Sequence, residues 1–130
     1  MQSHVTSNPT SFAMAGALAA IEGAEPEVER MIATYQERRD FLIPRLNAIP
    51  GLTCAPPGGA FYAFPRATGA FAPGRSNSVE LAEYLLEEAR VAVVPGSAFG
   101  ADEHIRLSFA TSLEELGRGI ERIAEALSRG

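Results

Sequence analysis

The sequence contains no lysine, so apart from two histidines all of its basic side chains are arginines. Without a lysine amine these 130 residues cannot form a Schiff base and cannot use lysine as a general base. The single cysteine, Cys54, excludes an internal disulfide framework and is typical of a protein of the reducing cytoplasm. Together with His4 and His104 it is also too isolated to form a zinc site.

Long hydrophobic runs and an excess of positive charge are missing as well. No apolar stretch approaches the roughly 20 residues that a helix needs to cross a bilayer, and no signal peptide opens the sequence. The formal net charge of -5 argues against sequence-independent binding of nucleic acid. With 46% hydrophobic and 21% charged residues, the chain is expected to fold as one domain, or one domain with a short appendage.

The first half of the chain shows two helical patterns. The segment from Phe12 to Ile21 is Ala-rich and nearly all apolar, so a helix there needs partners on most of its surface. Thr10 or Ser11 can cap it. A second helix is predicted from about Glu27 to Ala48, which is long for so small a chain. Pro44 inside this run predicts a kink or a shortened helix.

Two further helices are predicted in the second half, each after a capping residue. Ser76-Asn77-Ser78 can cap the first, and its inward-facing residues are predicted to be Val79, Ala82, Leu85, Leu86 and Ala89. Ser112 can cap the last helix. Its apolar stripe consists of Leu113, Leu116, Ile120, Ile123 and Leu127.

Four short segments read as strands: Leu52–Cys54, Ala60–Phe64, Val91–Val94 and His104–Phe109. The glycine-rich turn between the first two predicts that they pair as antiparallel neighbours. The predicted fold class is therefore α/β: a small two-layer domain whose short mixed or antiparallel sheet of about four strands packs on helices. The first twenty-odd residues do not obviously belong to this domain.

The sequence contains few of the motifs that mark catalytic sites. Ser97 lies in Gly-Ser-Ala-Phe-Gly, which lacks the spacing of a nucleophile elbow and a convincing His/Asp pair. Gly58-Gly59 precedes a strand, whereas glycine-rich phosphate loops precede helices. Arg106 is more informative, because strand alternation places it with His104 and Ser108 on the polar face. A guanidinium on a rigid strand can receive both oxygens of a carboxylate, although a solvated surface arginine shows the same pattern.

Five segments in the right order carry a resemblance to a known family. They are QSHVTSNPTS (2–11), RRD (38–40), PGGAFY (57–62), VAVVPGSAFG (91–100) and IRLSFA (105–110). Together they resemble the C-terminal part of the class I/II pyridoxal-phosphate aminotransferases, especially the bacterial aspartate aminotransferase subgroup. The resemblance covers essentially the whole chain. It implies transfer of an amino group between an amino acid and a 2-oxo acid, in the cytoplasm.

The resemblance also implies a domain organisation. Residues 1–24 correspond to the tail of a large cofactor-carrying domain, and residues 25–130 to the smaller C-terminal domain with its connecting helix, 27–49. Arg106 matches the arginine that binds the substrate α-carboxylate. Thr6, Ser7 and Asn8 match a stretch near the active site and subunit interface, although capping the first helix is an equally good role for them. Gly59 lies in a segment near the domain cleft, where a tight turn is the alternative.

The resemblance further implies what this chain does not supply. The lysine that holds pyridoxal 5'-phosphate, the aspartate that pairs with the pyridine nitrogen and the aromatic residue stacked on the ring belong to the large domain. We therefore expect no catalytic residue in this chain, no bound cofactor in the chain alone, and a homo-oligomeric parent. Two alternatives remain: an autonomous, non-catalytic α/β binding or assembly module, and part of a lyase or synthase of the same family.

Overall fold

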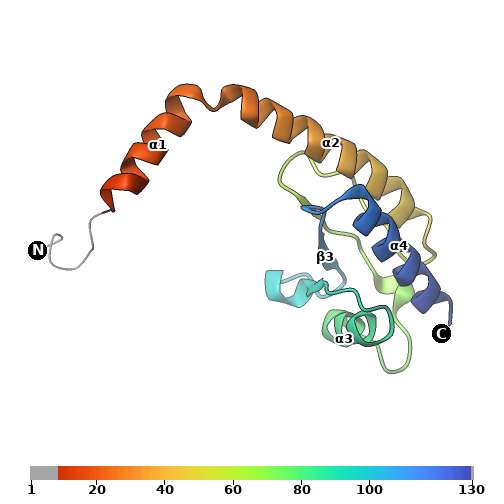
Figure 1. The fold of residues 1–130 in the computed structure, drawn as a ribbon. Helices are drawn as coiled ribbons and strands as arrows, with labels where there is room; N and C mark the ends of the chain where they lie inside the picture. Colours follow the sequence, from red (N-terminus) through yellow and green to blue (C-terminus); the bar gives the residue numbers. More distant parts are fainter. Residues whose placement is uncertain (1–8, 130) are drawn as a thin grey trace, which may run out of the picture. The chain divides into compact units, whose positions relative to one another are not determined.

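The computed structural model describes residues 9–129 (Figure 1). The chain divides after Thr34 into two compact units. The helices and strands follow in the order α1 (Ser11–Gly23), α2 (Glu25–Asn47), β1 (Tyr62–Ala63), the 3-10 helix η2 (Thr68–Ala70), α3 (Ser78–Glu88), β2 (Val94–Pro95), the 3-10 helix η3 (Gly96–Phe99), β3 (Ile105–Ser108) and α4 (Leu113–Ser128). No helix in this part of the chain has the length and apolar character needed to cross a membrane.

The first unit contains α1 and the beginning of α2. Thr10 occupies the N-cap position of α1, but its side chain makes no capping hydrogen bond, so the predicted side-chain cap is wrong for this residue. No residue of α1 is buried. α2 begins at Glu25, two residues before the predicted start, because a proline such as Pro26 is tolerated in the first turn of a helix. It continues through Pro44, so the helix is not shortened there.

The second unit is built around an antiparallel sheet of three strands, in the order β1-β3-β2. Tyr62 pairs with Ser108 between β1 and β3, and Val94 pairs with Arg106 between β2 and β3. This confirms the α/β fold class. The predicted number of about four strands is wrong, and the predicted pairing of residues 52–54 with 60–64 is absent among the described residues.

The segment Leu52–Cys54 fails to become a strand because other groups satisfy its backbone. The Asn47 side chain accepts a hydrogen bond from the Cys54 N–H at 2.7 Å and donates one to the Cys54 carbonyl at 3.0 Å. Thr53 instead forms an isolated antiparallel bridge with Arg66. Hydrogen bonds to the Asn47 side-chain amide therefore take the place of the strand pairing that the local sequence pattern predicted.

The segment Val91–Val94 is paired only at its end. The Val91 N–H donates to the carbonyl of Leu85 in α3 at 3.1 Å, so it completes the end of that helix. The preceding residue, Arg90, has a φ of 55°, in the left-handed region. The first residues of the predicted strand therefore form the turn after α3, and pairing with β3 begins only at Val94.

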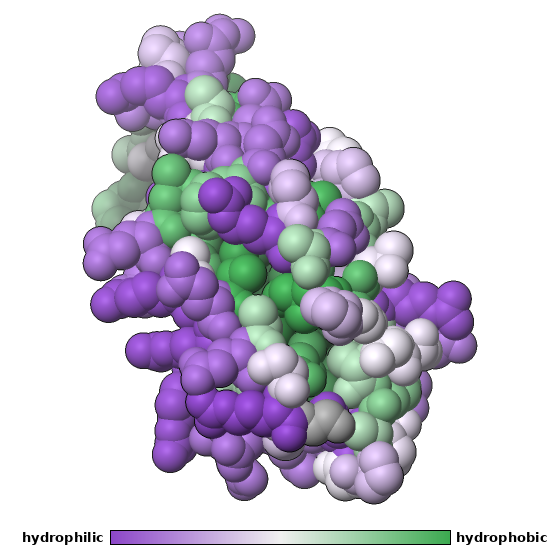
Figure 2. Space-filling model, turned by 90° about the vertical axis from the view of Figure 1, so that its right-hand side faces the viewer, coloured by the Kyte–Doolittle hydropathy of each residue, from purple (hydrophilic) through white to green (hydrophobic). Residues whose placement is uncertain are grey.

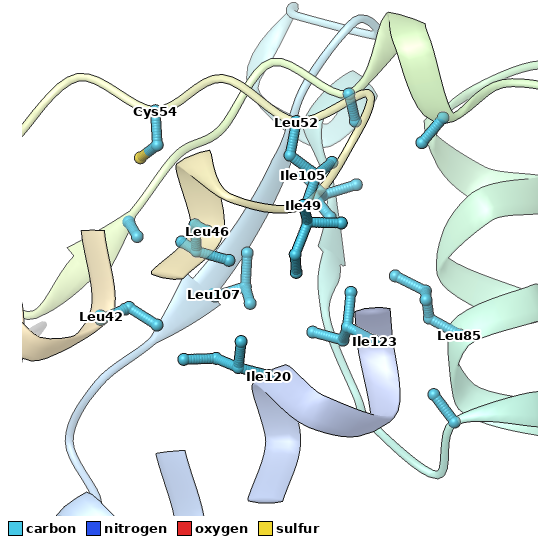
Figure 3. Packing of buried hydrophobic residues seen from close by; sticks show 14 of the residues in the cluster. Leu42, Leu46, Ile49, Leu52, Cys54, Leu85, Ile105, Leu107, Ile120 and Ile123 are labelled. Atoms are coloured by element: carbon cyan, nitrogen blue, oxygen red, sulfur yellow. The ribbon is translucent and has the colours of Figure 1, made fainter. Parts of the chain in front are cut away.

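Beneath the surface of the second unit, large aliphatic side chains from α2, α3, β3 and α4 converge (Figure 3). The fully buried ones include Leu42, Leu46, Leu81, Leu85, Ile105 and Ile123. α4 buries Leu116, Ile120 and Ile123 of the predicted stripe, and the end residues Leu113 and Leu127 are half-buried. α3 differs from its prediction: Leu81 is buried, while Val79 and Leu86 are exposed. On one face, hydrophilic side chains surround a hydrophobic middle (Figure 2).

Candidate functional site

β3 separates a buried face of the sheet from an accessible one. Ile105 and Leu107 are buried, whereas Arg106 is half-buried and Ser108 is exposed, as the alternation predicted. Cross-strand partners in a sheet share a face, so Tyr62 and Val94 lie on the same side as Arg106. The core thus anchors β3 from one side and leaves the Arg106 side chain on the other.

The Arg106 guanidinium lies over two aromatic rings. Its Cζ atom is 4.3 Å from the ring centroid of Tyr62 and 4.6 Å from that of Phe99. Within residues 9–129, no carboxylate forms an ion pair with Arg106 and no group accepts a hydrogen bond from its side chain. Its charge and its planar set of N–H donors are therefore available to a ligand. A carboxylate is the anion whose two oxygens that planar set matches best.

Further aromatic groups lie beside this arginine. The Phe64 ring stacks on the His104 imidazole with the centroids 4.9 Å apart and an interplanar angle of 10°. The Phe64 ring also forms a T-shaped contact with the Phe99 ring, with the centroids 5.9 Å apart. The Nδ1 atom of His104 is buried and has no hydrogen-bond partner among the described residues. We call Tyr62, Phe64, Phe99 and His104 the aromatic cluster.

η3 brings Phe99 to the cluster, and its placement depends on Gly96. The Gly96 N–H donates to the His104 carbonyl at 2.8 Å, and the Gly96 carbonyl accepts from Ala101 at 3.0 Å. A Cβ atom at position 96 would lie 2.1 Å from the Ala101 oxygen and 2.3 Å from the His104 oxygen. Only glycine allows this close approach of the two backbone segments.

A buried hydroxyl fixes the other side of η3. Ser78, at the start of α3, is fully buried and donates to Asp102 Oδ1 at 2.5 Å. The same hydroxyl oxygen accepts from the Ser97 N–H at 3.1 Å. The predicted helix cap is confirmed beside it, since the Asn77 side chain accepts from the N–H groups of Val79 and Glu80. α3, η3 and the loop that precedes β3 are thus joined by one polar network.

The remaining residues considered in the sequence analysis add little to the description of the site. Gly59 lies in the exposed loop before β1, with open space around it. Thr6, Ser7 and Asn8 lie outside the described residues. Ser97 contributes its backbone to the network at Ser78. Within the described part of the chain, neither the predicted Gly59 nor Ser97 forms a hydrogen bond or an ion pair with Arg106.

Of the aromatic cluster, only His104 was placed beside Arg106 by the sequence pattern; Tyr62, Phe64 and Phe99 were not. Alternation within residues 60–64 could have placed Tyr62 and Phe64 on one face of a strand. Phe99, by contrast, reaches Arg106 through the 3-10 turn of η3, and no periodic pattern predicts such a turn. Of the missed residues, Phe99 is therefore the one whose position depends on tertiary structure.

The residues of this chain do not by themselves fit a covalently held pyridoxal phosphate. That attachment needs the amine of a lysine, and none occurs in the 130 residues. This face of the sheet offers the guanidinium of Arg106, aromatic rings, the imidazole of His104 and the hydroxyl of Ser108. They can bind and orient a carboxylate, but we derive no chemical step through the cofactor from them.

The second unit is a small α/β domain, and from the open face of its sheet it presents an arginine that has no acidic partner within residues 9–129. Residues 1–123 match the family model described as aminotransferase class I and II. The chain belongs to this family, which confirms the resemblance carried by the five sequence segments. Pyridoxal phosphate is the cofactor expected of its members.

Individual relatives support the assignment. The aspartate aminotransferase of Geobacillus stearothermophilus is 48% identical over 124 residues, which are 95% of this chain and 32% of that protein. A probable aspartate/prephenate aminotransferase of Aquifex aeolicus is 46% identical, covering 98% and 32%. The crystal structure of the aspartate aminotransferase of Rhizobium meliloti matches with a TM-score of 0.91 at 41% identity, covering 98% of this chain and 34% of that one. The chain thus spans about one third of the length of these relatives.

Proposed function

We propose that the chain serves as the C-terminal part of a pyridoxal-phosphate-dependent aminotransferase, and that Arg106 binds the α-carboxylate of the amino acid and 2-oxo acid substrates. The observation that carries this proposal is the Arg106 guanidinium, which is half-buried on a rigid strand and has no acidic partner among residues 9–129. Membership of the family and the aspartate aminotransferases among the relatives support it.

The proposal includes a division of labour along the chain. Residues 1–24 would belong to a larger domain that carries the cofactor, and residues 25–130 to a smaller domain that includes the connecting helix. The larger domain would supply the lysine and with it the chemistry of the cofactor as an electron sink. The smaller domain would orient the substrate through Arg106 and close over it to exclude water. The parent would be a homo-oligomer, and the chain alone would show no turnover in an amino-group transfer assay.

Carboxylate binding can be tested on the chain itself by NMR titration with propionate. We expect saturable shifts of the amide signals of β3, and no such shifts with propionamide, which has the same shape and no charge. Replacing Arg106 with Gln removes a charge-assisted hydrogen-bonding partner, so binding should weaken about ten- to a hundredfold. Arg106→Lys should bind less well than the natural chain because an ammonium lacks the planar donor fork.

A matched control is available in Arg122, another arginine without an ion pair among the described residues, which lies on α4. Arg122→Gln changes the net charge equally and should leave propionate binding unchanged. Identical titration curves for the natural chain and Arg106→Gln would overturn the assignment of Arg106.

A further inference from the structure

Several arginines in the described part of the chain lie over aromatic rings, and Arg106 differs from the rest. Arg38, Arg45 and Arg75 each contact one ring, those of Tyr35, Phe41 and Tyr84 respectively. Arg106 contacts two, Tyr62 and Phe99. These two rings come from separate elements, β1 and the end of η3, so the tertiary structure brings them together at this one side chain.

An arginine can be held in place by an acidic group or by aromatic rings, and the two have different consequences for binding. A carboxylate partner occupies the N–H donors at the edge of the guanidinium and neutralises its charge. An aromatic ring attracts the cation through its face and accepts no hydrogen bond from the edge donors in that geometry. Aromatic contacts can therefore order the side chain and leave its charge and donors for a substrate.

We propose that Tyr62 and Phe99 are positioning residues for Arg106: their rings fix the guanidinium in the orientation that receives the substrate carboxylate. This inference rests on the function proposed above for Arg106. In this proposal two aromatic rings hold Arg106, whereas an acidic side chain pairs with other arginines of this chain, for example Glu103 with Arg66.

The surroundings of the two rings suit this task. Tyr62 belongs to the ladder with β3, directly opposite Ser108, so its backbone is tied to the strand that carries Arg106. Phe99 is half-exposed, at 48% of its surface, and would be free to move without support. That support comes from the edge of the Phe64 ring and from the hydrogen bonds at Gly96 and Ser97 that fix η3.

The order of the Arg106 side chain can be measured directly, by nitrogen-15 relaxation of its Nε–Hε group in the 130-residue chain. We expect Arg106 to be more ordered than the exposed Arg122. Phe99→Leu and Tyr62→Leu should each lower this order toward that of Arg122 and weaken propionate binding about two- to fivefold. Phe99→Tyr and Tyr62→Phe retain an aromatic face and should restore both properties.

Phe41→Leu is the matched control, because it removes the ring over a different arginine, Arg45. It should leave the order of Arg106 unchanged, and thermal unfolding of every variant establishes that the fold is retained. An unchanged Arg106 in both folded Leu variants would overturn the proposal. If the Leu variants lose order at Arg106 but neither the natural chain nor any variant binds propionate, the positioning role is supported and the proposed function is overturned. Failure of the positioning role and failure of the proposed function are therefore distinguishable.

Discussion

The arginines of this chain show how the environment of one residue type decides what it can do. Arg75 is buried, donates its Nε–H to the Ala70 carbonyl at 3.0 Å and lies over Tyr84, so its contacts serve the fold. Arg66 and Glu103 form an exposed ion pair of the kind that contributes little to stability. Arg106 has aromatic contacts and no acidic partner within residues 9–129. Among these three, only Arg106 has the properties of a carboxylate receptor.

The buried thiol of Cys54 makes the stability of the fold depend on pH. Desolvation raises the pKa of its thiol above its ordinary value, and a backbone hydrogen bond from Phe64 only partly offsets this effect. The folded state therefore holds the proton more tightly than the unfolded state. The resulting stabilisation is fully present below the thiol pKa of the unfolded chain and is lost as the pH rises through the folded-state pKa.

Urea unfolding at a series of pH values from neutral to about 10.5 tests this linkage, a range that brackets the unfolded thiol pKa of about 8.5. The free energy of unfolding of the natural chain should fall more steeply at alkaline pH than that of Cys54→Ala. Other titrating groups, including the tyrosines, are common to both proteins and cancel in the comparison. Parallel pH profiles would show that the Cys54 thiol has an unshifted pKa.

At the scale of elements, the network around Ser78 joins α3 to η3. Replacing Ser78 with Ala removes the donor to Asp102 and leaves the Ser97 N–H without its acceptor. Because Ser78 is fully buried, we expect a loss of about 1–3 kcal/mol in the free energy of unfolding. Ser128→Ala, which removes an exposed hydroxyl bonded to a helix carbonyl, is the control and should change stability by less than about 0.5 kcal/mol. Equal urea midpoints for the two variants would contradict a stabilising role for the network.

The elements that local sequence signals specify were predictable, and those that depend on distant partners were not. α4 follows its capping serine and buries the middle of the predicted stripe, because both signals lie within one helix. The open face of β3 was predictable from alternation for the same reason, and it led to Arg106. Asn47 replaces a strand partner at Cys54, and η3 delivers Phe99 to Arg106; both depend on tertiary contacts that no local pattern encodes.

At the scale of the whole molecule, α1 is the feature that most needs explanation. Its large apolar residues include Phe12 and Ile21, 80% and 84% exposed, and none of its residues is buried. Apolar surface of this kind marks a contact with another protein segment. If the chain is part of a larger aminotransferase, this surface has lost its neighbours and should cause loose self-association. A dedicated binding module should instead bury it in an assembly of fixed stoichiometry.

Sedimentation velocity over a concentration series distinguishes these cases. We expect the natural chain to form a broad, concentration-dependent distribution of species, and Leu18→Glu to shift it toward the monomer. Leu86→Glu is the matched control, because Leu86 is exposed to a similar degree, 52% against 56% for Leu18, but lies on α3. A single oligomer of defined size would favour the module.

We propose that these residues work as part of an aminotransferase that holds pyridoxal phosphate on a lysine elsewhere in the polypeptide. The most direct test is the intact mass of the protein expressed from its natural gene, together with its absorbance spectrum near ~400 nm after pyridoxal phosphate is added. We expect a mass much larger than 13.8 kDa and a bound yellow cofactor. A product of 13.8 kDa that binds no cofactor would contradict it and favour a non-catalytic α/β module.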